Sequence, residues 1–224
     1  MQTLTQDIWT HSSETRMGPG VCFPNRMSII RRPEGGIVVH APNAMDTALL
    51  AEIQALGTVT DIIAPNLMHH LHAASAKAHF PQATLWGPPG LKEKEGLAID
   101  KELRAGEHIP GLQCIPLPSG PKLGEHVFLH AASGTLVLCD LIFNMRSPNG
   151  WAMPMILKMV GCHECASTSK SLKWVFVKDD FPAFVQSVKA LEELEFSRII
   201  VNHGEVIEDG AKAAFKQATA WLHA

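Results

Sequence analysis

Short apolar segments that alternate with helical patterns are the feature of this sequence that most restricts its fold. GIVVHA (36–41), TDIIA (60–64) and ATLW (83–86) read as buried strands, and the segments between them carry apolar residues at helical spacing. This alternation favours an α/β layer arrangement. The expected strands of this half are 7–10, 27–32, 36–41, 60–64 and 83–86, and the expected helices are 45–56 and 67–79. Gly35 and Gly36 predict a hairpin turn.

The second half repeats the order of strands followed by helix, strand and helix. Its expected strands are 112–117, 125–130, 135–139 and 198–202, and its expected helices are 180–195 and 209–221. Residues 145–173 fit neither pattern and are rich in methionine, which indicates a lid or insertion over a pocket or at a dimer contact. No stretch resembles a linker, so we expect one domain over residues 1–224.

Composition narrows the class of protein. The 46% hydrophobic and 18% charged residues exclude a disordered chain, and a net charge of −3 gives no basic excess for nucleic acid. Five cysteines make a full disulfide framework improbable. The sequence shows neither a membrane-spanning apolar run nor a signal-like start, so we expect a soluble cytoplasmic protein without a membrane partner. A small-molecule ligand is the expected partner, and a homodimer is left open.

The twelve histidines point to the chemistry. Three groups of polar residues directly follow expected strands: His69, His70 and His72 after TDIIA, Asp140 after TLVLC, and His203 after RIIVN. Ligands bind at the carboxyl ends of strands in open α/β sheets, so these side chains can converge on one metal ion. Imidazole and carboxylate suit zinc, iron or manganese. Taken singly, each residue also has an ordinary structural reading, as a helix-lining histidine or as a turn or capping aspartate.

These segments also resemble those of a known protein family. The segments MSIIRRPEGGIVVHAPN, LGTVTDIIAPNLMHHLHA, FPQATLWGPPGL, SGTLVLCDLIFN and IIVNHGE resemble the metallo-β-lactamase superfamily, and more closely a divergent branch of unknown function. The resemblance implies a four-layer αββα sandwich of two mixed sheets, with metal ligands on loops at one edge. Members usually bind two metals and activate a bridging water for hydrolysis.

The resemblance also implies that half of the metal motif is replaced. The positions of the first metal site fall on Pro65, Leu67 and a place near Pro121, none of which is a ligand. The second site is retained, and its implied ligands are His69, His70, Asp140 and His203. We therefore expect one divalent metal at most: zinc first, then iron or manganese, or none. Four protein ligands would fill a tetrahedral zinc site, whereas five- or six-coordinate iron or manganese leaves room for water. Alternatively, one of the paired histidines is an acid or base.

Other residues are candidates for supporting roles. Glu125, His40 and His72 are the candidates for ligand orientation or acid/base chemistry. Their structural readings are a solvated strand end, a core histidine and a helix-surface histidine, respectively. Cys162, His163 and Cys165 resemble half of a zinc ribbon, but one CxxC pair more often means two reduced thiols.

Two functions follow as hypotheses. The first is a mononuclear metal-dependent hydrolase of a small molecule, whose catalytic residues the sequence does not identify. The alternative is a non-catalytic protein that binds a ligand or partner and keeps a degenerate metal site. A third hypothesis, redox chemistry at iron, has no support from the sequence, which shows neither a flavin-binding motif nor a second metal site.

Overall fold

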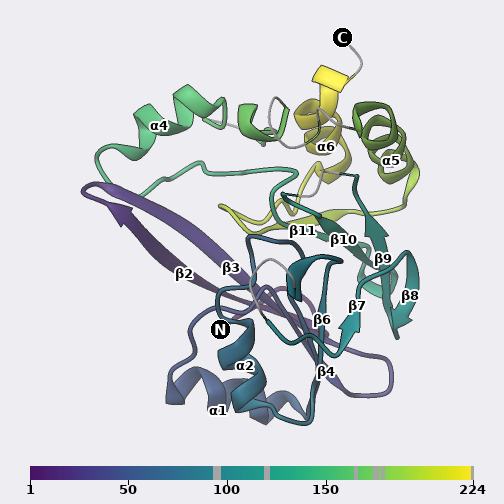
Figure 1. Ribbon diagram of the computed structural model, residues 1–224. Helices are drawn as coiled ribbons and strands as arrows, with labels where there is room; N and C mark the ends of the chain where they lie inside the picture. The colour runs from purple at the N-terminus through teal and green to yellow at the C-terminus, as the bar shows by residue number, and fades with distance from the viewer. Residues whose placement is uncertain (93–96, 119–121, 164–165, 174–176, 178–179, 223–224) are drawn as a thin grey trace.

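Two β-sheets packed face to face, with helices on both outer sides, form the molecule (Figure 1). This computed structural model describes the chain except for residues 93–96, 119–121, 164–165, 174–176, 178–179 and 223–224. The architecture is the αββα sandwich that the sequence predicted.

The first sheet has seven strands in the order β1-β2-β3-β4-β5-β6-β7. These are β1 (Gln2–Thr3), β2 (Ile8–Gly18), β3 (Val21–Arg31), β4 (Ile37–His40), β5 (Val59–Ile63), β6 (Thr84–Gly87) and β7 (Lys101–Glu102). Pairing is antiparallel from β1 to β4 and parallel from β4 to β7. The hairpin predicted at Gly35-Gly36 is present as β3–β4, with Ser28 opposite His40.

The second sheet has five strands in the order β12-β11-β10-β9-β8. These are β8 (Gly106–Ile109), β9 (Leu112–Pro116), β10 (His126–His130), β11 (Thr135–Leu138) and β12 (Arg198–Val201). The pair β11–β12 is parallel, and the other pairs are antiparallel. Parallel pairing puts the carboxyl ends of β11 and β12 at the same edge.

Three apolar layers hold the sandwich together. The helices α1 (Thr47–Leu56) and α2 (Ala73–His79) bury Leu49, Ile53 and Ala76 against the first sheet. The helices α5 (Phe181–Glu193) and α6 (Ala211–Thr219) cover the second sheet in the same way. Between the sheets, side chains such as Val38 and Phe128 interdigitate. Strands buried on both faces explain the continuous apolar runs in the sequence.

The β2–β3 hairpin is longer than the sequence indicated. Strands were expected over 7–10 and 27–32 only, yet the pair extends to a tip at Gly18 and Val21. The hairpin projects from the body, and its tip meets the segment that carries α4 (Met153–Val160) (Figure 1). There the N–H of Ala152 donates to the carbonyl of Gly20 at 3.0 Å. The segment 145–173 is thus joined to the hairpin through a small apolar cluster that includes Met153 and Phe23.

Helix α2 begins six residues later than predicted. The side-chain oxygen of Asn66 accepts hydrogen bonds from the backbone N–H groups of Met68 at 2.9 Å and His69 at 2.7 Å. An asparagine that bonds to the backbone two and three residues ahead competes with a helix and makes a turn. Residues 67–72 therefore form turns, and His72 becomes the residue that precedes the helix.

Within the described residues, no helix is both long and apolar enough to cross a bilayer.

Candidate metal centre

Three side chains from distant parts of the chain meet at one edge of the sandwich. One ligand atom each from His69, Asp140 and His203 lies within 4.8 Å of the other two. Nε2 of His69 is 3.2 Å from one carboxylate oxygen of Asp140, and Nε2 of His203 is 3.3 Å from the other. Both imidazoles thus direct a nitrogen at the same carboxylate.

Strand pairing explains why Asp140 and His203 are neighbours. Leu138 and Val201 are paired at the ends of β11 and β12, and each ligand follows its strand end by two residues. His69 comes from the other sheet, in the turn that follows β5. The centre therefore spans the gap between the two sheets.

Glu125 supports the loop that carries Asp140. It is completely buried, and one carboxyl oxygen accepts hydrogen bonds from the backbone N–H groups of Cys139, Asp140 and Leu141 at 2.9, 3.0 and 3.3 Å. Burial and the nearby Asp140 raise the pKa of Glu125 to about 8, against the opposing effect of these hydrogen bonds. Glu125 does not line the pocket described below, so its position fits a role in orienting Asp140.

Two contacts fix His203. Its Nδ1 lies 2.8 Å from the backbone carbonyl of Pro24 in β3, which leaves Nε2 as the nitrogen that faces Asp140. A carbonyl acceptor requires the proton on Nδ1, and this tautomer gives Nε2 a free lone pair. The next residue, Gly204, has a φ of +112°, and a Cβ atom there would lie 2.1 Å from the carbonyl oxygen of Asn144. Only glycine fits this approach.

The donor set fits a metal ion. Two imidazole nitrogens and one carboxylate are ligands for zinc and for iron, and three protein ligands leave coordination positions open. Burial opposes ionisation of Asp140, yet His69 and His203 hold the pKa of this carboxyl below its usual range. Burial likewise opposes protonation of His69, but Asp140 raises the pKa of His69 overall. An ionised carboxylate that attracts positive charge is the environment a bound cation requires.

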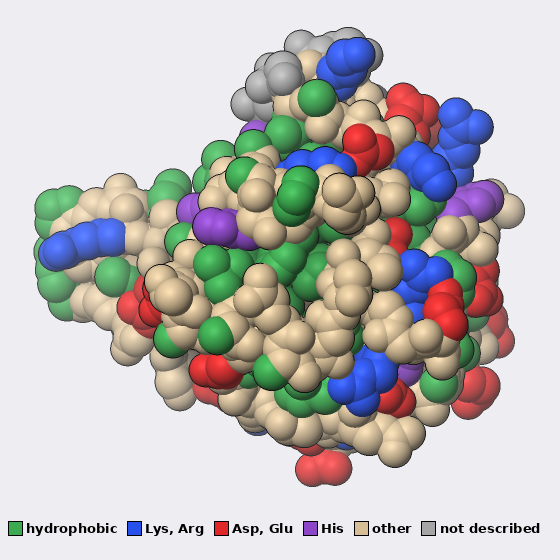
Figure 2. Space-filling view, turned by 90° about the horizontal axis from the view of Figure 1, so that it is seen from below, with side chains coloured by type: hydrophobic (Ala, Val, Ile, Leu, Met, Phe, Trp, Pro, Cys, Tyr) green, Lys and Arg blue, Asp and Glu red, His purple; other side chains and the backbone are tan. Residues whose placement is uncertain are grey.

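The three side chains open into a pocket of about 410 Å³. The remaining walls come from the β2–β3 hairpin, the segment after β4, residues near α2, Phe143, Val160 and the segment 169–172. Figure 2 shows histidine and hydrophobic side chains side by side between the projecting arm at the left and the main body. The pocket is large enough for a small organic ligand.

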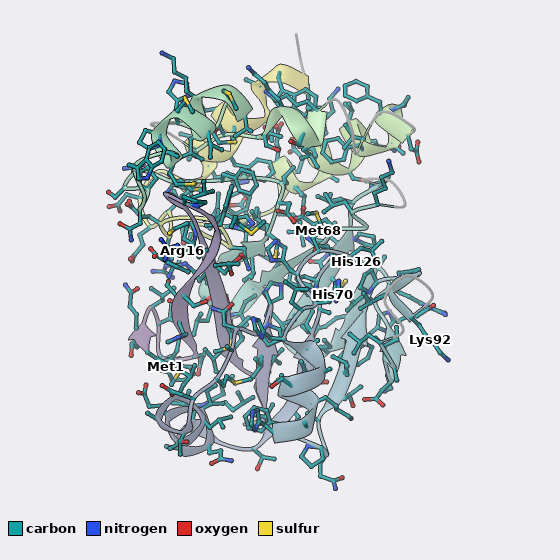
Figure 3. All side chains as sticks on the ribbon, turned by 60° about the vertical axis from the view of Figure 1, so that its left-hand side comes forward. Met1, Arg16, Met68, His70, Lys92 and His126 are labelled. Atoms are coloured by element: carbon teal, nitrogen blue, oxygen red, sulfur yellow. The ribbon has the colours of Figure 1, made fainter. Side chains whose placement is uncertain are left out.

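The neighbouring histidines are separated by this geometry. Among the described residues, the cluster contains His69 but not His70, which is half-buried in the same turn and lies near the middle of the view in Figure 3. His72 lines the pocket, because α2 starts after it. His72 is thus brought to the site, and His70 is not part of the cluster.

His40 lies at the end of β4 and is 2% exposed. Within the described part of the chain, neither of its ring nitrogens has a hydrogen-bond partner, and its ring packs edge-on against Phe128 with centroids 5.4 Å apart. Burial, together with the charge of nearby His69, lowers the pKa of His40 to about 3. His40 is therefore a buried residue at the end of β4 that is neutral at pH 7.

The positions of the implied first metal site hold apolar residues. Pro65 and Leu67 are buried, and Leu67 packs in the core beneath α2. Pro121 and Cys165 lie outside the described residues. Cys162 is buried in the cluster beside α4, with its thiol directed at the carbonyl of Val160.

The sequence reasoning missed two residues of this centre, Asn66 and Pro24. Asn66 donates a hydrogen bond to Asp140 at 2.6 Å, and its position in PNLMHH, at the end of an expected strand, was the available signal. Pro24 contributes only a backbone carbonyl, for which no sequence signal exists.

Comparisons with known proteins agree with the fold. Solved structures with similar folds include a metallo-beta-lactamase from Pontibacter korlensis (13% identity, TM-score 0.68, covering 99% of this chain and 97% of that one). Another is a metallo-beta-lactamase from Hirschia baltica (15% identity, TM-score 0.65, covering 98% of this chain and 95% of that one). A third is the metallo-beta-lactamase FIM-1 from Pseudomonas aeruginosa in its mono-zinc form (14% identity, TM-score 0.63, covering 98% of this chain and 94% of that one). At these identities the likeness shows the fold. No curated protein matches the sequence. The sequence model of a protein family described as the metallo-beta-lactamase superfamily matches residues 7–197, and the chain therefore belongs to that superfamily.

Proposed function

We propose that this protein is a mononuclear metal-dependent hydrolase of a small molecule, with His69, Asp140 and His203 as the metal ligands. The observation that carries the proposal is the convergence of these three donor atoms, within 4.8 Å of one another, in a pocket of ligand size. Buried Leu67 and Pro65 at the other motif positions favour one metal over two.

Three ligands change the expectation for zinc. With His70 as a fourth ligand, tetrahedral zinc would have no place for water, whereas the three-residue cluster leaves one position open. Zinc is therefore the metal we propose first, and iron or manganese remains compatible with the same donors. When bound, the metal would supply Lewis-acid chemistry, by polarising a substrate carbonyl and acidifying a water molecule.

The chain supplies the remaining groups. Asn66 and Glu125 orient Asp140, and Pro24 sets the tautomer of His203. His72 is the titratable side chain that lines the described pocket and is not a ligand. We assign to it the transfer of a proton to the leaving group, a task that suits imidazole near neutral pH.

Metal content tests the ligand set. Wild-type protein purified without added metal should carry about one equivalent, and Asp140→Ala and His203→Ala should each lose it. The paired histidines provide a matched control, since His69→Ala should lose metal and His70→Ala should keep it. Two equivalents in wild type, or loss in His70→Ala, would show that the assignment of ligands is wrong.

Turnover tests the reaction. The metal-loaded protein is assayed with 4-nitrophenyl esters of increasing chain length, before and after treatment with a chelator. Hydrolysis that is lost with the chelator, restored by metal and absent in Asp140→Ala supports the hydrolase. A full metal site with no turnover of esters, lactones or amides would favour the non-catalytic binding protein.

A further inference from the structure

We infer that the pocket accepts an uncharged ligand with an apolar body, such as a medium-chain ester or amide. The inference deepens the proposed function, because it names the substrate class of the same site. It concerns binding by the pocket walls, which can be measured without metal and without turnover.

The first argument is the charge of the walls. The pocket-lining residues of the described chain include no Lys, Arg or Glu, and Asp140 is their one carboxylate. That carboxylate already faces His69 and His203 and accepts a hydrogen bond from Asn66. A carboxylate or phosphate on a ligand would lose its hydration here and meet no Lys or Arg on the walls, and an ammonium group would meet only Asp140, which His69 and His203 already face. Burying such a charge is costly.

The second argument is that several polar wall groups already take part in hydrogen bonds within the protein. The amide of Asn25 donates to the Thr15 hydroxyl at 2.8 Å, and the amide of Asn43 donates to two backbone carbonyls. The Ser169 hydroxyl accepts from the backbone N–H of Leu172 at 3.1 Å. Because these groups already bond within the protein, Asn25, Asn43 and Ser169 offer fewer free partners to a highly polar ligand such as a sugar.

The third argument is the apolar surface that remains. Phe23, Phe143, Val160 and Leu172 line the pocket from different elements. Three further lining residues, Met17, Met68 and Leu71, are 69%, 49% and 76% exposed. Large apolar side chains that stay in water around a pocket gain free energy when a ligand covers them, and methionine adapts to varied shapes. An alkyl chain fits this wall, with its polar end toward the His69–Asp140–His203 cluster.

Methionine methyl groups make the test local. Metal-free protein labelled at methionine methyl carbons is titrated with octanamide, octanoate and octyltrimethylammonium, which share a chain but differ in charge. Octanamide should shift the signals of Met17 and Met68 and leave those of Met155 and Met159 in place, since the latter pair is exposed outside the pocket. Each charged analogue should bind at least about tenfold more weakly than octanamide.

Two lysine variants sharpen the result. Met17→Lys puts a cation on the pocket wall, and Met155→Lys puts the same cation on a similarly exposed site of α4 outside it. Met17→Lys should raise the affinity for octanoate relative to octanamide, and Met155→Lys should leave the ratio at the wild-type value. The inference is overturned if a charged analogue binds wild type as tightly as octanamide, or if octanamide shifts no pocket methionine up to its solubility limit.

The two proposals fail separately. Octanamide binding without metal-dependent hydrolysis of any 4-nitrophenyl ester would refute the hydrolase and keep the ligand class. Metal-dependent hydrolysis that is as fast on a charged ester as on a neutral one would refute the ligand class and keep the hydrolase.

Discussion

The side chain of Asn66 connects two proposed metal ligands from opposite halves of the chain. Its amide nitrogen donates to Asp140 at 2.6 Å, while its oxygen accepts from the backbone N–H of His69 at 2.7 Å. One residue thus orients the carboxylate and shapes the turn that presents the imidazole.

Replacing Asn66 by Ala should lower metal affinity about 10- to 100-fold, the usual effect of removing a residue that orients a ligand. Competition with a chromophoric chelator measures the change. Asn43→Ala is the matched control, because Asn43 lines the same pocket but bonds to backbone carbonyls. Equal affinities in Asn66→Ala and wild type would contradict the role of Asn66.

Replacing Gly204 by Ala should reduce both stability and metal content. The added Cβ would lie 2.1 Å from the Asn144 carbonyl oxygen at a φ that side chains disfavour, so the backbone beside His203 must move. Gly18→Ala is the control, since a Cβ there meets nothing within 4 Å. Thermal unfolding and metal analysis of both variants check the prediction, and a Gly204→Ala protein that matches wild type in both would refute it.

Glu125 should tolerate Gln far better than Ala. With the pKa of Glu125 raised to about 8, its carboxyl group is mostly neutral at pH 7, and the Gln carbonyl can accept the same backbone N–H groups. Ala would leave these buried donors without an acceptor and should cost about 3–5 kcal/mol of unfolding free energy. Urea denaturation followed by tryptophan fluorescence at pH 7 distinguishes the two. Similar losses in both variants would mean that the carboxylate charge is what matters.

His40 should make the fold sensitive to acid. Its pKa is about 3 in the folded protein and near 6.5 when unfolded, so the unfolded state binds an extra proton between these values. The contribution of neutral His40 to stability is complete above pH 6.5 and is lost as pH falls toward 3, by about 1.4 kcal/mol per pH unit.

A His40→Asn variant isolates this contribution, because the other histidines titrate in both proteins. Urea unfolding between pH 7 and 4 should show a smaller loss of stability with falling pH in His40→Asn than in wild type. Identical slopes would show that His40 is not kept neutral by the fold.

Replacing His72 by Gln should lower kcat about 100-fold while metal content stays unchanged. His72 lines the pocket without belonging to the ligand cluster, so its loss affects proton transfer and not metal binding. His79→Gln, an exposed position on α2, is the control and should keep wild-type kcat. An unchanged pH–rate profile in His72→Gln would remove His72 from the mechanism.

Strand ends were the reliable signal in the sequence. Asp140 and His203 each follow a short apolar run that forms a strand, and parallel pairing of β11 with β12 brings them together. The sandwich could likewise be predicted, because its strands are buried on both faces and read as continuous apolar runs.

The pocket wall could not be predicted in the same way. Residues 11–18 and 21–26 are mostly polar or partly exposed, so the outer part of the β2–β3 hairpin lacks the apolar alternation of a strand. Gly18-Pro19-Gly20 was the one turn signal at its tip. The turn that Asn66 makes with Met68 and His69 could not be predicted either, because helical spacing does not reveal it.

The bond from His203 to the Pro24 carbonyl joins residues that are 179 positions apart in the chain. Pro24 lies in the seven-stranded sheet and His203 follows the end of β12, in the other sheet, by two residues, so no short segment contains a complete centre. Closing such a long loop lowers the conformational entropy of the chain. The packing of the folded protein must offset this loss before a metal can bind tightly. A metal ion that binds only the folded chain would then stabilise the contact between the two sheets by mass action. Its removal would lower the melting temperature of the whole sandwich.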